Sequence, residues 1–183
     1  MNSFYVPLAV RELQGSEIKV CAAIGFPLGA TSFNVKLFEA EEALKNGARA
    51  IDMVINLGAF KSGDYHLIEE EIKGIVKVSG KSVITKIIIE ACYLNRDEII
   101  NLSKMAMELG ADFVKTSTGM GFRGATVEDV KLIRTVVGLK MGIKAAGGIN
   151  SYNKSKRIIE AGADRIGTSQ GVKIIREYLE SVS

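Results

Sequence analysis

The chain has 183 residues, of which 47% are hydrophobic and 25% are charged, and its formal net charge is +3. This size and composition are typical of one globular domain with a sizeable core, so we expect residues 1–183 to form a single domain. The basic residues are spread along the chain without a long cationic run, and Trp is absent. This pattern argues against a nucleic-acid surface and is compatible with a small anionic ligand.

The start of the chain has no basic segment before its apolar stretch, and no long uncharged apolar run follows. We therefore expect neither a signal peptide nor a membrane span. Cys21 and Cys92 lie in or beside apolar runs, and two cysteines are too few to define a disulfide framework. A cytoplasmic protein is the simplest interpretation.

Short apolar runs rich in Val and Ile recur along the chain, and their first residues are separated by 32, 32, 30, 30 and 22 positions. Segments with helical spacing of apolar residues lie between them. In chain order, the expected strands are 18–23, 50–55, 82–90, 112–117, 142–146 and 164–168. The expected helices are 32–46, 64–79, 96–109, 127–137 and 153–161, followed by a helix-like tail. The alternation predicts an α/β fold with a parallel sheet.

Three of the expected helices end in similar short segments, each containing a glycine: Gly47, Gly110 and Gly162. Glycine at this point can adopt the left-handed conformation that ends a helix. Such regularity favours a TIM (β/α)8 barrel over an open doubly wound sheet. Only six strands are visible, however, so we expect a barrel truncated to about six βα units, either as an open curved sheet or paired with a second copy.

Charged residues interrupt several of the expected strands. Because the outer face of a barrel is covered by helices and is apolar, strand alternation places Asp52, Lys115 and Lys144 on the inner face. The same reasoning adds Lys86 and Glu90. Each could instead be a solvated residue at a strand end, but burying several charges together is costly unless they pair or take part in chemistry. Clustered cations can also keep one lysine neutral and nucleophilic.

Two glycine-rich segments, 146–150 and 167–171, follow the last two expected strands. In TIM barrels, the loops at this position often bind phosphate through backbone N–H groups. Either segment alone could be an ordinary tight turn. Their joint position favours a phosphate site.

Six short motifs follow one another along the chain: G-F-P-L-G-A (25–30), I-D-M-V-I-N (51–56), K-I-I-I-E (86–90), G-A-D-F-V-K-T-S-T-G (110–119), G-I-K-A-A-G-G-I (142–149) and R-I-G-T-S (165–169). With these motifs in this order, the chain resembles the deoxyribose-phosphate aldolase family over nearly its whole length. The resemblance implies a class I Schiff-base aldolase that reversibly cleaves 2-deoxy-D-ribose 5-phosphate to acetaldehyde and D-glyceraldehyde 3-phosphate. It implies a small sugar phosphate as partner and no metal or other cofactor.

The resemblance also implies roles for single residues. Lys115 would be the Schiff-base nucleophile, and Lys144 would supply the neighbouring positive charge that lowers its pKa. Asp52 would be the acid/base group. Lys86 would be a further charge close to the site and is grouped with the residues that bind the substrate or its phosphate. The phosphate would be held, mainly through backbone donors, by Gly147, Gly148, Gly167 and Ser169.

The remaining metal-ligating and nucleophilic side chains have simpler interpretations. His66 lies among charged residues at the start of an expected helix, without His or Cys companions at ligand spacing, so we expect it at the surface. Cys92 follows an expected strand, and we expect a buried structural thiol.

The chain departs from the family pattern at several points. The family begins with a helix and two further strands that have no counterpart here, and Ala91, Met120 and Gln170 replace its usual residues. Three hypotheses stay open: an active aldolase, a catalytically impaired remnant that at most binds sugar phosphates, and a different Schiff-base or phosphate-binding barrel enzyme. We expect the isolated monomer to be marginally stable and the chain to form a homo-oligomer, most simply a dimer.

Overall fold

The structure, a computed structural model, describes residues 1–182 and divides the chain into two compact units. The first unit comprises Met1–Ile88 with Met105–Phe113, and the second comprises Ile89–Lys104 with the chain from Val114 onward. The described residues form six strands and eight α-helices in a largely alternating order, which is an α/β fold.

In the first unit, strands β1 (Cys21–Ile24), β2 (Ala50–Val54) and β3 (Ile84–Ile88) pair in parallel in that order. All five residues of β2 are buried, because β2 lies between two strands and carries mostly apolar side chains. The register places Asp52 of β2 opposite Lys86 of β3. This unit therefore brings two of the predicted site residues together.

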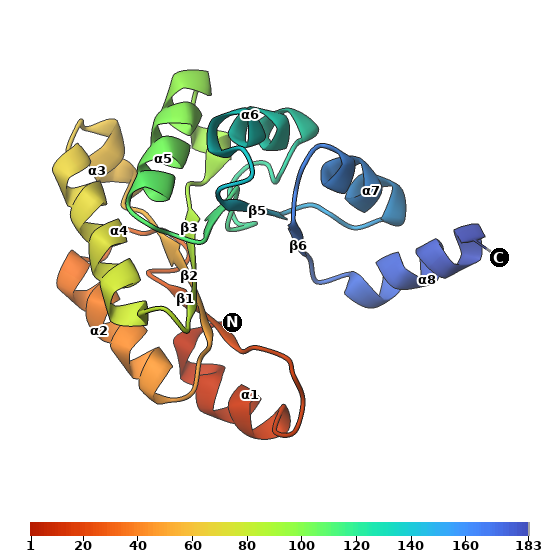
Figure 1. Cartoon of the computed structure of the whole chain (residues 1–183), viewed down its shortest axis with the longest axis horizontal. Helices are drawn as coiled ribbons and strands as arrows, with labels where there is room; N and C mark the ends of the chain where they lie inside the picture. Colours follow the sequence, from red (N-terminus) through yellow and green to blue (C-terminus); the bar gives the residue numbers. More distant parts are fainter. Residues whose placement is uncertain (183) are drawn as a thin grey trace. The chain divides into compact units, whose positions relative to one another are not determined.

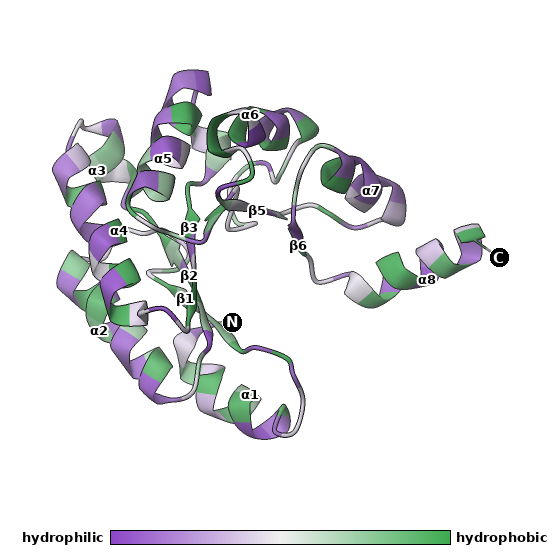
Figure 2. Ribbon diagram, in the orientation of Figure 1, coloured by the Kyte–Doolittle hydropathy of each residue, from purple (hydrophilic) through white to green (hydrophobic). Residues whose placement is uncertain are grey.

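Helices α2 (Phe33–Lys45) and α4 (Tyr65–Ser79) pack against each other and against β1 and β3, respectively. Figure 1 shows both helices along the same side of these strands. In α4, Ile68, Ile72 and Ile75 recur at helical spacing and are fully buried, so one face of the helix is apolar. Figure 2 shows this mixture of apolar and polar residues along the helices beside the apolar strands. The unit also contains two shorter helices, α1 (Val6–Glu12) and α3 (Leu57–Lys61).

The second unit contains β5 (Gly142–Ala146) and β6 (Arg165–Gly167), which pair in parallel. Helix α6 (Val127–Val137) packs on β5, and α7 (Tyr152–Glu160) packs on β6 and on α8 (Gly171–Val182). The boundary between the units falls within β4 (Phe113–Lys115) and α5 (Arg96–Glu108).

The expected alternation of strands and helices is confirmed in the described residues, including the six strands. The described residues thus contain six strands, two fewer than a complete eight-stranded barrel. Gly47, Gly110 and Gly162 have φ values of 100°, 85° and 114°, which confirms the left-handed helix ends. Within residues 1–182, no helix is both long enough and apolar enough to cross a membrane.

Candidate active site

A cavity of about 400 Å³ in the second unit contains two of the predicted catalytic lysines. Lys115 lies at the end of β4 and is only 8% exposed, and Lys144 lies in the middle of β5. Both side chains line the cavity together with the predicted phosphate-binding residues Gly147, Gly148, Gly167 and Ser169. The predicted proximity of these six residues is therefore observed.

Backbone hydrogen bonds fix the strand that carries Lys115. The N–H of Ile89 donates to the carbonyl of Lys115 at 3.0 Å, and the N–H of Thr116 donates to the carbonyl of Lys144 at 3.1 Å. Because the backbone is paired on both sides, the position at which the Lys115 side chain leaves β4 is well defined.

The two glycine-rich segments meet at the same cavity. Gly147 and Gly148 have φ values of 87° and 66°, which non-glycine residues rarely adopt. The hydroxyl of Thr168 donates to the carbonyl of Ile149 at 2.6 Å and accepts from the N–H of Gln170 at 2.9 Å. Helix α8 begins directly after this residue. Glycine-rich backbone and a helix N-terminus on one cavity wall are suited to an anionic group such as phosphate.

Asp52 and Lys86 form a buried ion pair in the first unit. The Nζ atom of Lys86 lies 2.9 Å from Oδ1 of Asp52, and both side chains are almost completely inaccessible. The thiol of Cys21 donates to the same carboxylate oxygen at 3.1 Å. For these two residues, the alternative of a solvated strand end is wrong, because their charges compensate each other within the strand pair.

A second buried ion pair, Lys36 with Glu71, was not predicted from the sequence. Both side chains are 0% exposed, and their N–O distance is 2.5 Å. Lys36 also donates to the carbonyl of Val54 at 2.9 Å, and Glu71 accepts from the N–H of Asn56 at 2.9 Å. Burial lowers the pKa of Lys36 and raises the pKa of Glu71, while their mutual attraction opposes both shifts. The pair thus holds the chain where β2 ends.

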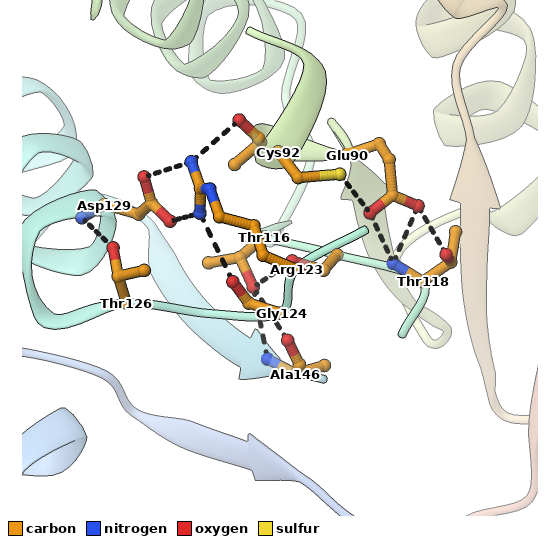
Figure 3. A network of polar contacts seen from close by, with 11 residues as sticks. Glu90, Cys92, Thr116, Thr118, Arg123, Gly124, Thr126, Asp129 and Ala146 are labelled. Carbon is orange, nitrogen blue, oxygen red and sulfur yellow. Dashed lines mark hydrogen bonds and ion pairs between the residues drawn. The ribbon is translucent and has the colours of Figure 1, made fainter. Parts of the chain in front are cut away.

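Glu90, predicted on an inner face, is 5% exposed and adopts a left-handed backbone conformation with φ of 50°. Figure 3 shows its carboxylate accepting from the N–H and the hydroxyl of Thr118. The same figure shows Arg123 bound to Asp129. Arg123 also donates to the carbonyl of Ala91 at 3.1 Å. The hydrogen bond and ion pair with Asp129 raise the pKa of Arg123. Arg123 and Asp129 were missed because they lie outside the matching motifs.

The other two predictions concern His66 and Cys92. The His66 side chain is 80% exposed beside Glu70, so its surface position is confirmed. Cys92 is buried, as expected, and burial raises the pKa of its thiol, which disfavours the thiolate.

A family model described as DeoC/LacD family aldolase matches residues 14–180. A deoxyribose-phosphate aldolase of Caldanaerobacter subterraneus subsp. tengcongensis is 51% identical over 180 residues, which cover 97% of this chain and 78% of the relative. A deoxyribose-phosphate aldolase of Thermococcus gammatolerans is 54% identical over 178 residues, which cover 96% and 79%.

Solved structures give the same picture. The aldolase QR15 superposes with a TM-score of 0.93 at 44% identity and covers 99% of this chain and 80% of its own. A deoxyribose phosphate aldolase from Aeropyrum pernix, described as a unique tetrameric structure, gives a TM-score of 0.89 at 34% identity and covers 100% and 76%.

Proposed function

Because the chain belongs to the DeoC/LacD aldolase family, we propose that it is a deoxyribose-phosphate aldolase. It would cleave 2-deoxy-D-ribose 5-phosphate reversibly to acetaldehyde and D-glyceraldehyde 3-phosphate. The observation that carries this proposal is the cavity that Lys115 and Lys144 share with the two glycine-rich segments. An amine nucleophile and a phosphate-binding wall in one cavity are what a Schiff-base reaction on a sugar phosphate requires.

Lys115 would act as the nucleophile. Its neutral amine adds to the aldehyde carbon of the open-chain sugar, and loss of water gives an iminium ion. Loss of the C3 hydroxyl proton to a base then allows the C2–C3 bond to break, with its electron pair moving toward the iminium nitrogen. D-Glyceraldehyde 3-phosphate leaves, and an enamine remains on Lys115. Protonation of the enamine at C2 and addition of water release acetaldehyde and restore the amine.

Lys144 would favour this nucleophile electrostatically. It lines the same cavity as Lys115, and two ammonium groups close together repel each other. Lys144 would thus hold the nearby amine in the neutral form and take part in proton transfer.

Asp52 would provide the acid/base group of the reaction, as the resemblance implies. Its ion pair with Lys86 supports this role, because a buried carboxylate needs a compensating charge to stay ionised. Lys86 would therefore act on the carboxylate rather than directly on the substrate phosphate.

The phosphate group would lie against Gly147, Gly148, Gly167 and Ser169. The left-handed conformations of Gly147 and Gly148 and the start of α8 support this placement. In this scheme the iminium on Lys115 is the electron sink, so the chemistry requires no metal or other cofactor.

The proposal extends to the whole chain. We propose that residues 1–183 form one partial βα-barrel domain that works in the cytoplasm as a homo-oligomer, most simply a dimer. A related aldolase described as tetrameric supports the homo-oligomer.

Borohydride trapping tests the function directly. The purified chain is incubated with 2-deoxyribose 5-phosphate and sodium borohydride, and its intact mass is measured beside that of Lys115→Ala. We expect a reduced adduct on the wild type and none on Lys115→Ala, because borohydride converts the iminium to a stable secondary amine. Lys156→Ala is the matched control, since Lys156 is an exposed lysine of the same unit, and it should be trapped like the wild type. Folded wild-type protein without an adduct would favour the impaired remnant.

A further inference from the structure

The loop that follows the proposed nucleophile runs from Thr118 to Gly124. Hydrogen bonds link both of its ends to the short segment that contains Glu90 and Ala91. At its start, the N–H of Thr118 donates to both carboxylate oxygens of Glu90, at 3.3 and 3.1 Å, and the Thr118 hydroxyl also donates to Glu90. The carboxylate is buried and accepts from the Cys92 thiol as well. Glu90 thus acts as an acceptor toward every donor in this group.

At the far end of the loop, Arg123 forms the hydrogen bonds. Its Nη2 atom donates to the carbonyl of Ala91 at 3.1 Å and to Asp129 at 3.2 Å, and Nη1 donates to Asp129 and to the carbonyl of Gly124 at 3.2 Å. Asp129 is itself fixed, because its N–H donates to the hydroxyl of Thr126 at the start of α6. The guanidinium therefore links the loop to the residue that follows Glu90.

The opposite side of the loop lies against the glycine-rich segment. A Cβ atom at Gly124 would lie 2.0 Å from the carbonyl oxygen of Gly147, and one at Gly147 would lie 3.2 Å from the Cα atom of Gly119. The N–H of Ala125 donates to the carbonyls of Ala146 and Gly147 at 3.0 and 3.2 Å. The two backbones are thus in direct contact, and Gly119 and Gly147 both line the cavity.

The backbone around Lys115 has hydrogen bonds of its own. The N–H of Ile89 donates to the carbonyl of Lys115, and the N–H of Thr116 donates to the carbonyl of Lys144. Removing the hydrogen bonds of Glu90 or Arg123 should therefore displace the loop and the glycine-rich segment, while the backbone of Lys115 stays in place.

We propose that Glu90 and Arg123 are positioning residues that hold the loop Thr118–Gly124 against Gly147 and thereby shape the part of the cavity that receives the phosphate group. This inference rests on the proposed aldolase function. It adds that two side chains behind the loop control the preference for phosphorylated over unphosphorylated sugars.

Steady-state kinetics with two substrates test the proposal. Wild type, Glu90→Gln and Arg123→Met are compared on 2-deoxyribose 5-phosphate and on 2-deoxyribose. For each variant we expect KM for the phosphorylated sugar to rise about tenfold, which corresponds to losing one hydrogen bond to a charged group, with kcat within about threefold of the wild-type value. The kcat/KM for 2-deoxyribose should stay close to wild type.

Two further variants act as controls. Glu128→Gln changes an exposed carboxylate of α6 and should leave both substrates unaffected. Arg123→Lys keeps the charge beside Asp129 but lacks the guanidinium fork, so it should recover only part of the loss. Circular dichroism checks that each variant is folded, and if Glu90→Gln does not fold, Arg123→Met carries the test.

The outcomes separate the two proposals. If the variants lose kcat/KM equally on both substrates, or lose none, the positioning role is overturned while the aldolase function stands. If the wild type turns over neither substrate, the proposed function fails, and calorimetry with inorganic phosphate then tests the positioning role. Weaker phosphate binding by Glu90→Gln than by Glu128→Gln would support it, and equal binding would overturn it.

Discussion

The ion pair of Lys36 with Glu71 is the most deeply buried pair of charges among the described ion pairs. Breaking a buried pair leaves one charge without compensation, which typically costs about 3–5 kcal/mol. We expect Glu71→Gln to lower the free energy of unfolding by about this amount in urea denaturation. The double variant Lys36→Met/Glu71→Gln should be more stable than Glu71→Gln, because it removes the isolated charge while the Gln oxygen can still accept from Asn56.

The neighbouring carboxylate of Glu70 provides the control. Its side chain is 51% exposed, so Glu70→Gln should change the free energy of unfolding by less than about 0.5 kcal/mol. If Glu71→Gln were as stable as Glu70→Gln, the buried pair would not contribute to stability.

The destabilisation of Glu71→Gln should also depend on pH. Burial lowers the pKa of Lys36 from its ordinary value of 10.5, and Glu71 opposes this shift. In Glu71→Gln, the pKa of Lys36 falls further in the folded state but not in the unfolded state. The folded variant therefore binds fewer protons than the unfolded variant. The cost is then complete below the folded pKa and disappears as pH rises toward the unfolded value. Urea denaturation between about pH 7 and pH 10 should show the variant approaching wild type, and a constant difference would contradict this.

The buried charged residues of the strands could be predicted from the sequence, whereas those of the helices and loops could not. Asp52 and Lys86 interrupt apolar strands, so their period of two indicated a buried face, and the structure places them in one ion pair. Lys36 lies in a helix where charged residues are common, and its partner Glu71 is far away in the sequence. Arg123 lies in a loop without periodicity. Their burial or bonding depends on tertiary contacts that no local pattern contains.

The contact between α2 and α4 depends on a glycine. A Cβ atom at Gly74 of α4 would lie 2.4 Å from the ring of Phe33 at the start of α2. Gly74→Ala gains helix propensity of about 1 kcal/mol, but overpacking typically costs about 1–3 kcal/mol. We expect a net loss of about 1 kcal/mol in urea denaturation. Phe33→Leu in the same chain should reduce this loss, since it removes the atoms that the new methyl group meets.

Gly58 of α3 is the matched helical glycine. A Cβ atom there would meet nothing closer than the Asn56 side chain at 3.5 Å, an ordinary contact. Gly58→Ala should therefore be neutral or stabilise the fold by up to about 1 kcal/mol. If both substitutions stabilise the protein equally, Phe33 does not restrict the approach of α4.

Element boundaries show where sequence patterns are informative. The expected strand 142–146 and helix 127–137 coincide with β5 and α6. The expected strand 18–23 begins too early, because Ile18 is 65% exposed and β1 starts only at Cys21, where pairing with Ala50 begins. Helices α1 and α3 were not predicted, since each is too short for a helical period to be visible.

At the scale of the whole molecule, α8 carries an exposed apolar stripe. Val172, Ile175, Leu179 and Val182 recur at alternating steps of three and four residues, and all are exposed. Figure 2 shows several apolar residues along this helix. Ile174, on another face of the helix, is buried. Such spacing is typical of a helix that packs against another helix.

We expect this stripe to mediate association between copies of the chain, because apolar side chains at helix-packing spacing favour a partner over water. Sedimentation equilibrium should show a concentration-dependent homo-oligomer for wild type. Ile175→Lys/Leu179→Lys should weaken the association by at least about tenfold, since burying a lysine charge at a helix contact is costly. Leu139→Lys, at an apolar site that is 97% exposed outside the helices, should leave it unchanged. Association that persists in the double variant would assign the oligomer to another surface, and a monomeric wild type would remove the proposed dimer.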